Sequence, residues 1–279
     1  MQPAAFDYHR PGTIEEAVDL LGRVDGAKAL AGGHSLLPAM KLRLSSPPAL
    51  VDLGRIAGLA GISTEDGSLR IGALTTHSEI QHSGLIEQEC PLLAEAAATI
   101  GDPAVRNRGT IGGSLAHADP AADLPTVITA LGATVIVTGK GGEREIAAAD
   151  FFTGLFATAL GRGEVITSIR VPRLEAGTGT AYVKHRHPAS SYAVVGVAAI
   201  VRGSGGAISG GSVAIGGVTA NPVLLDVIAG ADPVAATSAS VSGAITSPIG
   251  DLYASGEYRV HLAGVLTKRA LTTAIARAG

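Results

Sequence analysis

The stretch Ala29-Leu30-Ala31-Gly32-Gly33-His34-Ser35-Leu36 ends a short apolar run in two glycines, a histidine and a serine. A similar stretch, Thr110-Ile111-Gly112-Gly113-Ser114, follows further along the chain. Glycine has no Cβ atom and adopts positive φ readily, so the N–H groups of successive residues can turn toward one anion. Two such loops in one chain predict one long phosphate-bearing ligand that is held at two points.

Either glycine pair alone is also compatible with an ordinary turn. The chain contains 38 glycines, and further pairs occur at 141–142, 205–206, 210–211 and 216–217. No Gly-x-Gly-x-x-Gly sequence opens a helix after an N-terminal strand, and the Gly-x-x-x-x-Gly-Lys-Ser/Thr pattern of a P-loop is absent. The ligand is therefore not assigned by these two common nucleotide motifs.

Composition limits the class of protein. The chain has 279 residues, 46% of them hydrophobic and 16% charged, which suits about two domains with their own cores. We find no apolar run of the roughly 18 residues that a membrane span needs, and no basic and apolar N-terminal segments of a signal peptide.

The net charge of −3 argues against a general nucleic-acid binder. The single Cys90 excludes an internal disulfide and a cysteine-rich zinc or iron–sulfur site in this chain, and we expect it in the core. A cytoplasmic location fits these features.

Helix and strand signals alternate in the first part of the chain. Thr13 with Glu16 reads as a capping box that opens a helix, a short strand is expected at 28–31, a short helix or ordered loop at 35–44, and a strand at 50–53. This order predicts a small α/β unit over residues 1–55.

The next part, residues 56–176, is predicted to form a second α/β unit. Its expected elements are a hairpin turning at Asp66-Gly67, a capped helix from Thr76, helices at 91–100 and 121–131, and strands at 133–137, 143–146 and 164–171. Residues 101–124 show no helical or strand period, and so long an irregular stretch inside a compact domain indicates function.

Residues 174–180 are the best linker candidate, and the sequence changes character beyond them. Strands at 182–186, 193–201 and 207–215, with a turn at 203–206, predict an antiparallel sheet, and helices are expected at 233–244 and 257–276. The predicted fold class is therefore α+β, with one domain at 1–176 and a C-terminal domain of antiparallel sheet and helices at 177–279.

Few side chains suggest catalysis or metal binding. Asp119 and Asp123 lie four residues apart, and each is either a helix cap or an acceptor for ligand hydroxyls. His117 with Asp119 lacks a third metal ligand, and the adjacency of His34 and Ser35 is no evidence for a catalytic triad. We expect no metal site and no catalytic side chain.

Two long motifs make the sequence recognisable. Residues 31–44, Ala-Gly-Gly-His-Ser-Leu-Leu-Pro-Ala-Met-Lys-Leu-Arg-Leu, resemble the first flavin motif in the medium subunits of molybdenum hydroxylases, the family of aerobic carbon monoxide dehydrogenase and xanthine dehydrogenase. Residues 106–125, from Arg-Asn-Arg-Gly-Thr-Ile-Gly-Gly-Ser to Asp-Leu-Pro, resemble the second. The resemblance spans the whole chain and includes the strand at 164–166 and the segment Ser255-Gly256-Glu257-Tyr258-Arg259.

This resemblance implies a cofactor, a fold and a set of contacts. The fold would be the FAD-binding p-cresol methylhydroxylase type, two α/β subdomains with FAD between them followed by a smaller domain. The pyrophosphate and its surroundings would be held by Ala31, Gly32, Gly33, His34, Ser35, Leu36, Thr110, Ile111, Gly112, Gly113 and Ser114. Asp123 would bind the ribityl chain, Ile166 and Tyr192 would lie near the isoalloxazine, Lys184 would reach toward the flavin or adenine end, and Lys28 would approach the cofactor.

The resemblance also implies partners and an activity. A small subunit would carry 2Fe–2S clusters and a large subunit the molybdopterin cofactor, in a dimer of heterotrimers. This chain would pass electrons through FAD to an external acceptor, namely a quinone, NAD or dioxygen, in the cytoplasm or at the inner face of the membrane. The substrate stays open. The alternatives are a standalone flavoprotein oxidase or reductase of the same fold, with a covalent flavin link through His34 as one variant, and a scaffold without catalytic function.

Overall fold

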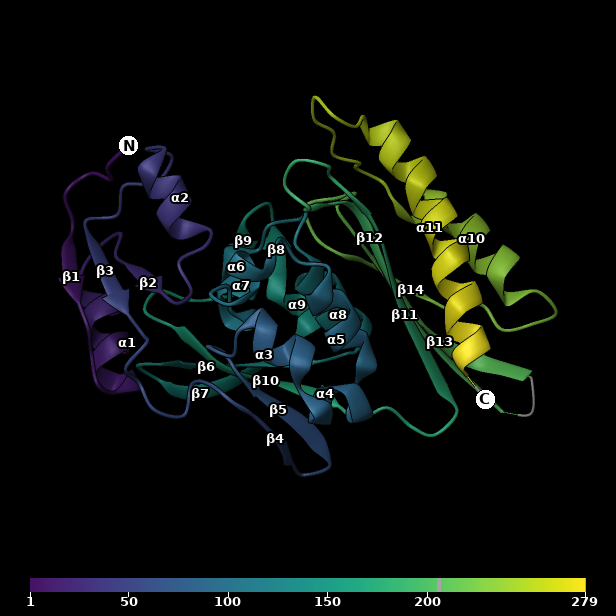
Figure 1. Cartoon of the computed structure of the whole chain (residues 1–279), viewed down its shortest axis with the longest axis horizontal. Helices are drawn as coiled ribbons and strands as arrows, with labels where there is room; N and C mark the ends of the chain where they lie inside the picture. The colour runs from purple at the N-terminus through teal and green to yellow at the C-terminus, as the bar shows by residue number, and fades with distance from the viewer. Residues whose placement is uncertain (205–206, 279) are drawn as a thin grey trace.

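The computed structural model describes residues 1–204 and 207–278, and the chain folds into three units arranged side by side (Figure 1). Part of the turn predicted at 203–206 therefore lies outside the described residues. The mixture of helices and sheets confirms the predicted α+β class, and each unit contains one main sheet. Within the described ranges, no helix is both long enough and apolar enough to cross a membrane.

The N-terminal unit is a small parallel sheet with two helices. It contains β1 (Asp7–His9), α1 (Ile14–Arg23), β2 (Lys28–Leu30), α2 (Leu36–Lys41) and β3 (Ala49–Asp52), with strand order β1-β3-β2. The Thr13 hydroxyl accepts a hydrogen bond from the Glu16 N–H at 3.2 Å, so α1 starts where the sequence predicts. Helix α1 packs Ala17, Val18 and Leu21 against β3. This packing fixes the direction in which β2 delivers the first glycine pair.

The middle unit is built on a five-stranded antiparallel sheet of order β4-β5-β10-β6-β7. Its strands are β4 (Ile62–Glu65), β5 (Ser68–Gly72), β6 (Thr134–Gly139), β7 (Gly142–Ala147) and β10 (Val165–Pro172), with a small hairpin of β8 (Phe152–Gly154) and β9 (Ala157–Thr158). The predicted Asp66-Gly67 turn is present, with positive φ at both residues.

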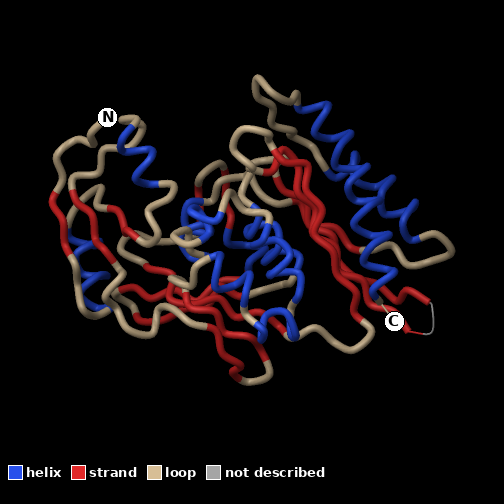
Figure 2. The backbone as a smooth tube through the Cα atoms, in the orientation of Figure 1, coloured by secondary structure: helices blue, strands red, loops and turns tan. Residues whose placement is uncertain are grey.

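Short helices cover one face of this sheet (Figure 2). They are α3 (His77–His82), α4 (Gly84–Glu89), α5 (Pro91–Ala98), α6 (Pro103–Arg106), α7 (Ile111–His117), α8 (Asp123–Ala130) and α9 (Ala148–Phe151). The predicted capping box at Thr76 and Glu79 is complete. The prediction that residues 101–124 are irregular is wrong, because α6 and α7 lie there; four and seven residues are too few to show a helical period.

The C-terminal unit is a four-stranded antiparallel sheet between two layers of helices. Its strands are β11 (Thr178–Arg186), β12 (Ala193–Ser204), β13 (Ala207–Gly216) and β14 (Val223–Asp226), and α10 (Pro233–Ala244) and α11 (Gly256–Arg277) cover its outer face (Figure 1). In β12, Val195 and Val197 pack toward these two helices, whereas Ala198 and Ile200 join the core of the middle unit with α5 and α8. The sheet therefore belongs to two cores and holds the C-terminal unit firmly against the middle one.

Candidate functional site

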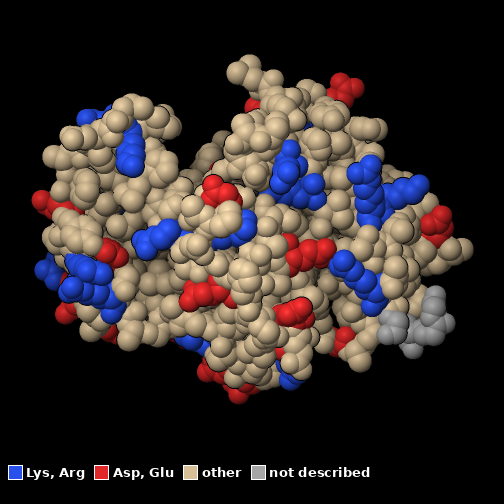
Figure 3. All heavy atoms as spheres, viewed as in Figure 1, with Lys and Arg blue, Asp and Glu red and all other residues tan. Residues whose placement is uncertain are grey.

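A cavity of about 730 Å³ lies between the units, within the size range of small-molecule and cofactor sites. Its wall includes residues 25–36 of the N-terminal unit, residues 160–166 and part of 109–119 from the middle unit, and residues 190–192 from the C-terminal unit. The space-filling view shows the hollow between the N-terminal unit and the rest, with charges of both signs scattered over that face (Figure 3). The cavity thus brings together both glycine motifs, although they are far apart in the sequence.

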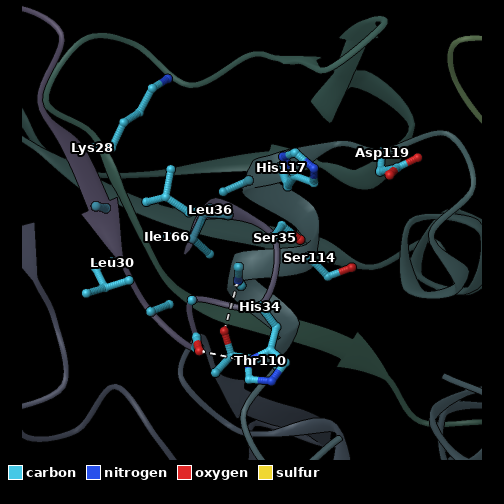
Figure 4. A pocket seen from close by; sticks show the side chains of 18 of the residues that line it. Lys28, Leu30, His34, Ser35, Leu36, Thr110, Ser114, His117, Asp119 and Ile166 are labelled. Atoms are coloured by element: carbon cyan, nitrogen blue, oxygen red, sulfur yellow. Dashed lines mark hydrogen bonds between the residues drawn. The ribbon is translucent and has the colours of Figure 1, made fainter. Parts of the chain in front are cut away.

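The two glycine motifs touch each other through backbone. A Cβ atom on Gly32 would collide with the carbonyl oxygen of Arg108, and one on Gly113 would lie 3.7 Å from the Cβ of Ala31. Glycine at position 32 is therefore required by the contact between the motifs. This contact closes one side of the cavity, where His34, Ser35 and Ser114 lie near one another (Figure 4).

The first motif presents unused backbone donors. Gly33 has φ of +76°, and the chain turns there between β2 and α2. In the part of the chain that the structure describes, the backbone N–H groups of Gly32, Gly33, His34 and Ser35 have no hydrogen-bond acceptor, and all four residues line the cavity. Consecutive free N–H groups at a turn are a site for an anion such as a phosphate.

The second motif is different, because its backbone donors are already engaged. Ile111 donates to the Thr75 carbonyl at 3.0 Å, Gly112 to the Ala73 carbonyl at 2.8 Å, Gly113 to the Thr110 hydroxyl at 3.2 Å, and Ser114 to the Thr110 carbonyl at 3.0 Å. These bonds attach the motif to the segment after β5 and start α7. The expectation that both loops offer backbone N–H groups is therefore corrected. The second loop contributes the Thr110 and Ser114 hydroxyls, and its backbone packs against Gly32 of the first loop.

Asp123, at the first position of α8, lies at the cavity wall with 4% of its surface exposed. Its Oδ1 accepts a hydrogen bond from the Tyr182 hydroxyl at 2.5 Å, and its Oδ2 accepts one from Lys184 Nζ at 2.9 Å. Burial raises the pKa of Asp123, while Lys184 and Tyr182 oppose that rise. Burial and the charge of Asp123 hold the pKa of Tyr182 well above its usual value.

Most of the residues predicted from the sequence line this cavity, and two do not. Ile111 is fully buried in the core of the middle unit, because its position in α7 turns the side chain away from the cavity. Lys184 lies behind Asp123, where its Nζ also donates to the Thr99 carbonyl at 3.1 Å. The other predicted residues all line the wall: Lys28, Ala31, Gly32, Gly33, His34, Ser35, Leu36, Thr110, Gly112, Gly113, Ser114, Asp123, Ile166 and Tyr192.

Three residues of this region are missed by sequence reasoning. Phe156, 54% exposed with φ of +53°, lies at the cavity with its ring centroid 5.2 Å from that of His117. Tyr182 stands two residues before Lys184 on the same strand face, and that alternation is the signal that could have found it. His77 lines the cavity but is 5% exposed, and burial, with the charges of Arg106 and His34, lowers its pKa to about 4.

Tyr192 is the aromatic side chain that the C-terminal unit contributes to the cavity. It is 41% exposed, in the loop between β11 and β12. Burial and the charge of Asp119 raise its pKa. Lys28 and Ile166 lie across the cavity from Asp119 (Figure 4).

Comparison with known proteins assigns the fold and the family. Residues 4–174 match the FAD binding domain in molybdopterin dehydrogenase, and residues 180–274 match the CO dehydrogenase flavoprotein C-terminal domain. The carbon monoxide dehydrogenase medium chain of Hydrogenophaga pseudoflava is 41% identical over 99% of both chains. The alpha subunit of the 6-hydroxypseudooxynicotine dehydrogenase complex of Paenarthrobacter nicotinovorans is 39% identical over 100% of this chain and 97% of its own. A chain in the structure of the Hydrogenophaga pseudoflava carbon monoxide dehydrogenase that lacks the Mo-pyranopterin moiety matches with a TM-score of 0.95 at 41% identity, covering both chains fully.

The fold and the cavity thus define an FAD-binding oxidoreductase subunit. More particularly, the chain belongs to the family of FAD-binding medium subunits of molybdenum hydroxylases. The alternative of a standalone flavoprotein oxidase is not favoured, because the relatives named above are subunits of larger complexes. The predicted class and cofactor are therefore confirmed.

Proposed function

We propose that this cavity holds FAD with its pyrophosphate on the free N–H groups of residues 32–35. The observation that carries the assignment is the run of backbone donors without acceptors at the cavity wall. Such donors, which face the cavity from consecutive residues, match the oxygens of a diphosphate. The Ser35, Thr110 and Ser114 hydroxyls add donors beside them.

The remaining contacts follow from the side chains around these donors. Asp123 accepts hydrogen bonds from the hydroxyls of the ribityl chain through its remaining lone pairs, since each of its oxygens already accepts one bond. Ile166 and Tyr192 contact the isoalloxazine, and Lys28 approaches the cofactor from the open side. Lys184 acts through Asp123, whose negative charge it balances.

When bound, FAD would supply electron transfer to the complex, between 2Fe–2S clusters on the small subunit, which would be reduced by substrate oxidation at the molybdopterin cofactor of the large subunit, and an external acceptor. The protein's task is to bind and orient the flavin and to exclude water from its inner side. We further propose a dimer of heterotrimers with a quinone, NAD or dioxygen as acceptor. We place the complex in the cytoplasm, at the inner face of the membrane when the acceptor is a quinone.

The substrate is decided outside this chain. Relatives of 41% and 39% identity are named for carbon monoxide and for 6-hydroxypseudooxynicotine, so similarity of the medium subunit does not track the substrate. We propose carbon monoxide dehydrogenase as the first activity to assay in the assembled complex, with nitrogen heterocycles as the second.

The direct test is FAD binding by the purified full-length chain. We expect flavin absorbance, and an apparent dissociation constant for FAD that rises with the concentration of ADP, which competes for the pyrophosphate site. Asp123→Ala should weaken FAD by about 1–3 kcal/mol, the usual range for losing a buried hydrogen-bond partner. Asp232→Ala, which removes the N-cap of α10 in the C-terminal unit and touches no residue of the cavity wall, is the control. A protein that is colourless after incubation with excess FAD and removal of the free FAD would overturn the proposal.

A further inference from the structure

One motif singled out from the sequence takes no part in the cavity wall. Arg259 belongs to the Ser255–Arg259 segment, lies in the first turn of α11, and is 6% exposed. Its Nη1 donates to the Val194 carbonyl at 2.6 Å and to the Gly217 carbonyl at 2.8 Å. Its Nη2 donates to Asp251 Oδ2 at 2.6 Å. One buried guanidinium therefore joins the start of α11 to the ends of two strands.

The residues it holds are neighbours of the cavity. The N–H group of Ala193, next to Val194, donates to the Ala121 carbonyl at 3.0 Å. The N–H group of Gly217 donates to the Pro120 carbonyl at 2.9 Å. Residues 120 and 121 form the turn between Asp119 and Asp123, both of which line the cavity. The two strand ends that Arg259 holds are therefore attached to this wall by two backbone hydrogen bonds.

The backbone is closely packed where β12 begins and β13 ends. Gly217 has φ of +82°, and a Cβ atom there would lie 2.6 Å from the Val194 carbonyl oxygen and 3.0 Å from the Ala193 carbonyl oxygen. Arg259 donates to two carbonyls that are held this closely, and the planar guanidinium fixes their separation better than a flexible ammonium can. Tyr192, which lines the cavity, is two residues before Val194.

Burial of this cation has an energetic cost. Its carboxylate partner is Asp251, whose side chain is 53% exposed, so the charge of the guanidinium is compensated mainly by backbone carbonyls. Removing an ion of this size from water costs several kcal/mol, and a protein in which an apolar side chain replaces a buried charge is often equally stable. A buried arginine at this position is explained by the geometry that it imposes on Val194 and Gly217.

We propose that Arg259 is a positioning residue for the cofactor site: it fixes the ends of β12 and β13, and through Ala193 and Gly217 it sets the turn at 119–123 and the loop that carries Tyr192. This inference rests on the proposed function, since it assigns Arg259 a role in FAD affinity. It links the first turn of α11, which lies at the outer face of the sheet (Figure 1), to the part of the cavity wall that Asp119, Asp123 and Tyr192 form.

The test uses the full-length chain with Arg259→Met, Arg259→Lys and a matched control, Arg277→Met. Arg277 is at the other end of α11, where its Nη1 donates to the Thr180 carbonyl at 2.7 Å and to Glu95 at 3.2 Å, and it does not line the cavity. Two quantities are measured: hydrogen exchange of the Ala193 and Gly217 amides without FAD, and the FAD dissociation constant. Unfolding in urea identifies a merely structural effect.

We expect Arg259→Met to speed exchange at both amides and to raise the FAD dissociation constant about tenfold, equivalent to ~1.4 kcal/mol. Arg259→Lys should give a smaller change in the same direction, because a single ammonium nitrogen keeps the charge but cannot replace both donor nitrogens, Nη1 and Nη2, of the guanidinium. Arg277→Met should lower stability without changing either quantity. The inference is overturned if Arg259→Met loses stability while both quantities stay at wild-type values. If Arg259→Met does not fold, wild-type values in Arg259→Lys overturn it equally. If the wild-type chain itself does not bind FAD, the proposed function fails, and the amide exchange still decides whether Arg259 positions the turn.

Discussion

The hydroxyl of Tyr182 on β11 donates a 2.5 Å hydrogen bond to the carboxylate of Asp123 on α8, so the C-terminal unit orients a side chain that the middle unit places at the cavity wall. Lys184, on the same face of the strand, donates to the second carboxylate oxygen at 2.9 Å. Both oxygens are therefore fixed from one strand. Strand β11 joins the domains by a buried ion pair as well as by packing, and the orientation of Asp123 depends on the docking of the C-terminal unit.

Removal of Lys184 should be more damaging than removal of the Tyr182 hydroxyl. Lys184→Met leaves Asp123 buried without its cation, which raises the pKa of the carboxyl further and should lower the free energy of unfolding by about 3–5 kcal/mol. Tyr182→Phe keeps the ion pair and removes one hydrogen bond to a charged group, worth about 1.5–3 kcal/mol. Urea unfolding of both variants measures the difference. A Lys184→Met chain at least as stable as Tyr182→Phe would show that the pair is not the dominant interaction.

Elements with local signals were predictable from the sequence. Helix α10 spans Pro233–Ala244 as expected, with Asp232 accepting a hydrogen bond from the Ala235 N–H at the N-terminus. The Asp66-Gly67 hairpin and the Thr76 cap follow from residue types within a few positions of each other. Information of this kind is contained in the segment itself, and tertiary packing does not override it here.

Elements that depend on distant partners were not predictable. The short strand β1 exists because Asp7–His9 pairs with β3, and β14 because Val223–Asp226 pairs with β13. Neither has enough alternation to be recognised alone. Helices α6 and α7 were missed because four and seven residues are too few to show a helical period, and the first N–H groups of α7 bond to the distant Thr75 and Ala73 carbonyls.

The candidate site shows the same division. The glycine motifs mark the cavity correctly, because the residue types are local. Their hydrogen bonds are not local: the N–H of Gly112 is satisfied by the Ala73 carbonyl, whereas the N–H groups of residues 32–35 have no acceptor among the described residues, even though the Arg108 backbone packs against Gly32. The roles of Tyr182 and Arg259 likewise depend on where β11 meets α8 and where α11 meets the ends of β12 and β13.

Substitution of Gly112 should act on folding before it acts on the cofactor. A Cβ atom there would lie 2.6 Å from the Cβ and 2.7 Å from the carbonyl oxygen of Ala73, so Gly112→Ala should lower the free energy of unfolding by about 1–3 kcal/mol through overpacking. Gly243→Ala in α10, where nothing lies within 4 Å, should instead stabilise the chain by about 0.5–1 kcal/mol. Thermal unfolding of the two variants measures both effects. Equal changes in the two would contradict the packing described for Gly112.

The thiol of Cys90 should be unreactive in the native protein. Cys90 is completely buried, and burial raises its pKa to about 12, so almost no thiolate exists at neutral pH. A chromogenic disulfide reagent should detect this thiol only after denaturation. The variant Glu87→Cys adds an exposed thiol on α4. This thiol should react at once, while Cys90 in the same chain should stay unreactive until denaturation. Rapid reaction of the wild-type chain would mean that the segment between α4 and α5 opens in the native state.

The stability of the chain should decrease on mild acidification because of His77. Burial is the main cause of its lowered pKa of about 4, so between pH 6.5 and 4 the unfolded chain binds a proton that the folded chain does not. The stabilisation is fully present above pH 6.5 and is lost as the pH falls through about 4, a loss of about 3 kcal/mol for a difference of ~2.5 pKa units. Urea unfolding across this range should therefore show a smaller pH dependence in His77→Gln than in the wild-type chain. His82→Gln, at the exposed end of the same helix, is the matched control. If His77→Gln loses stability with acid as steeply as the wild-type chain does, other groups are responsible for the acid sensitivity.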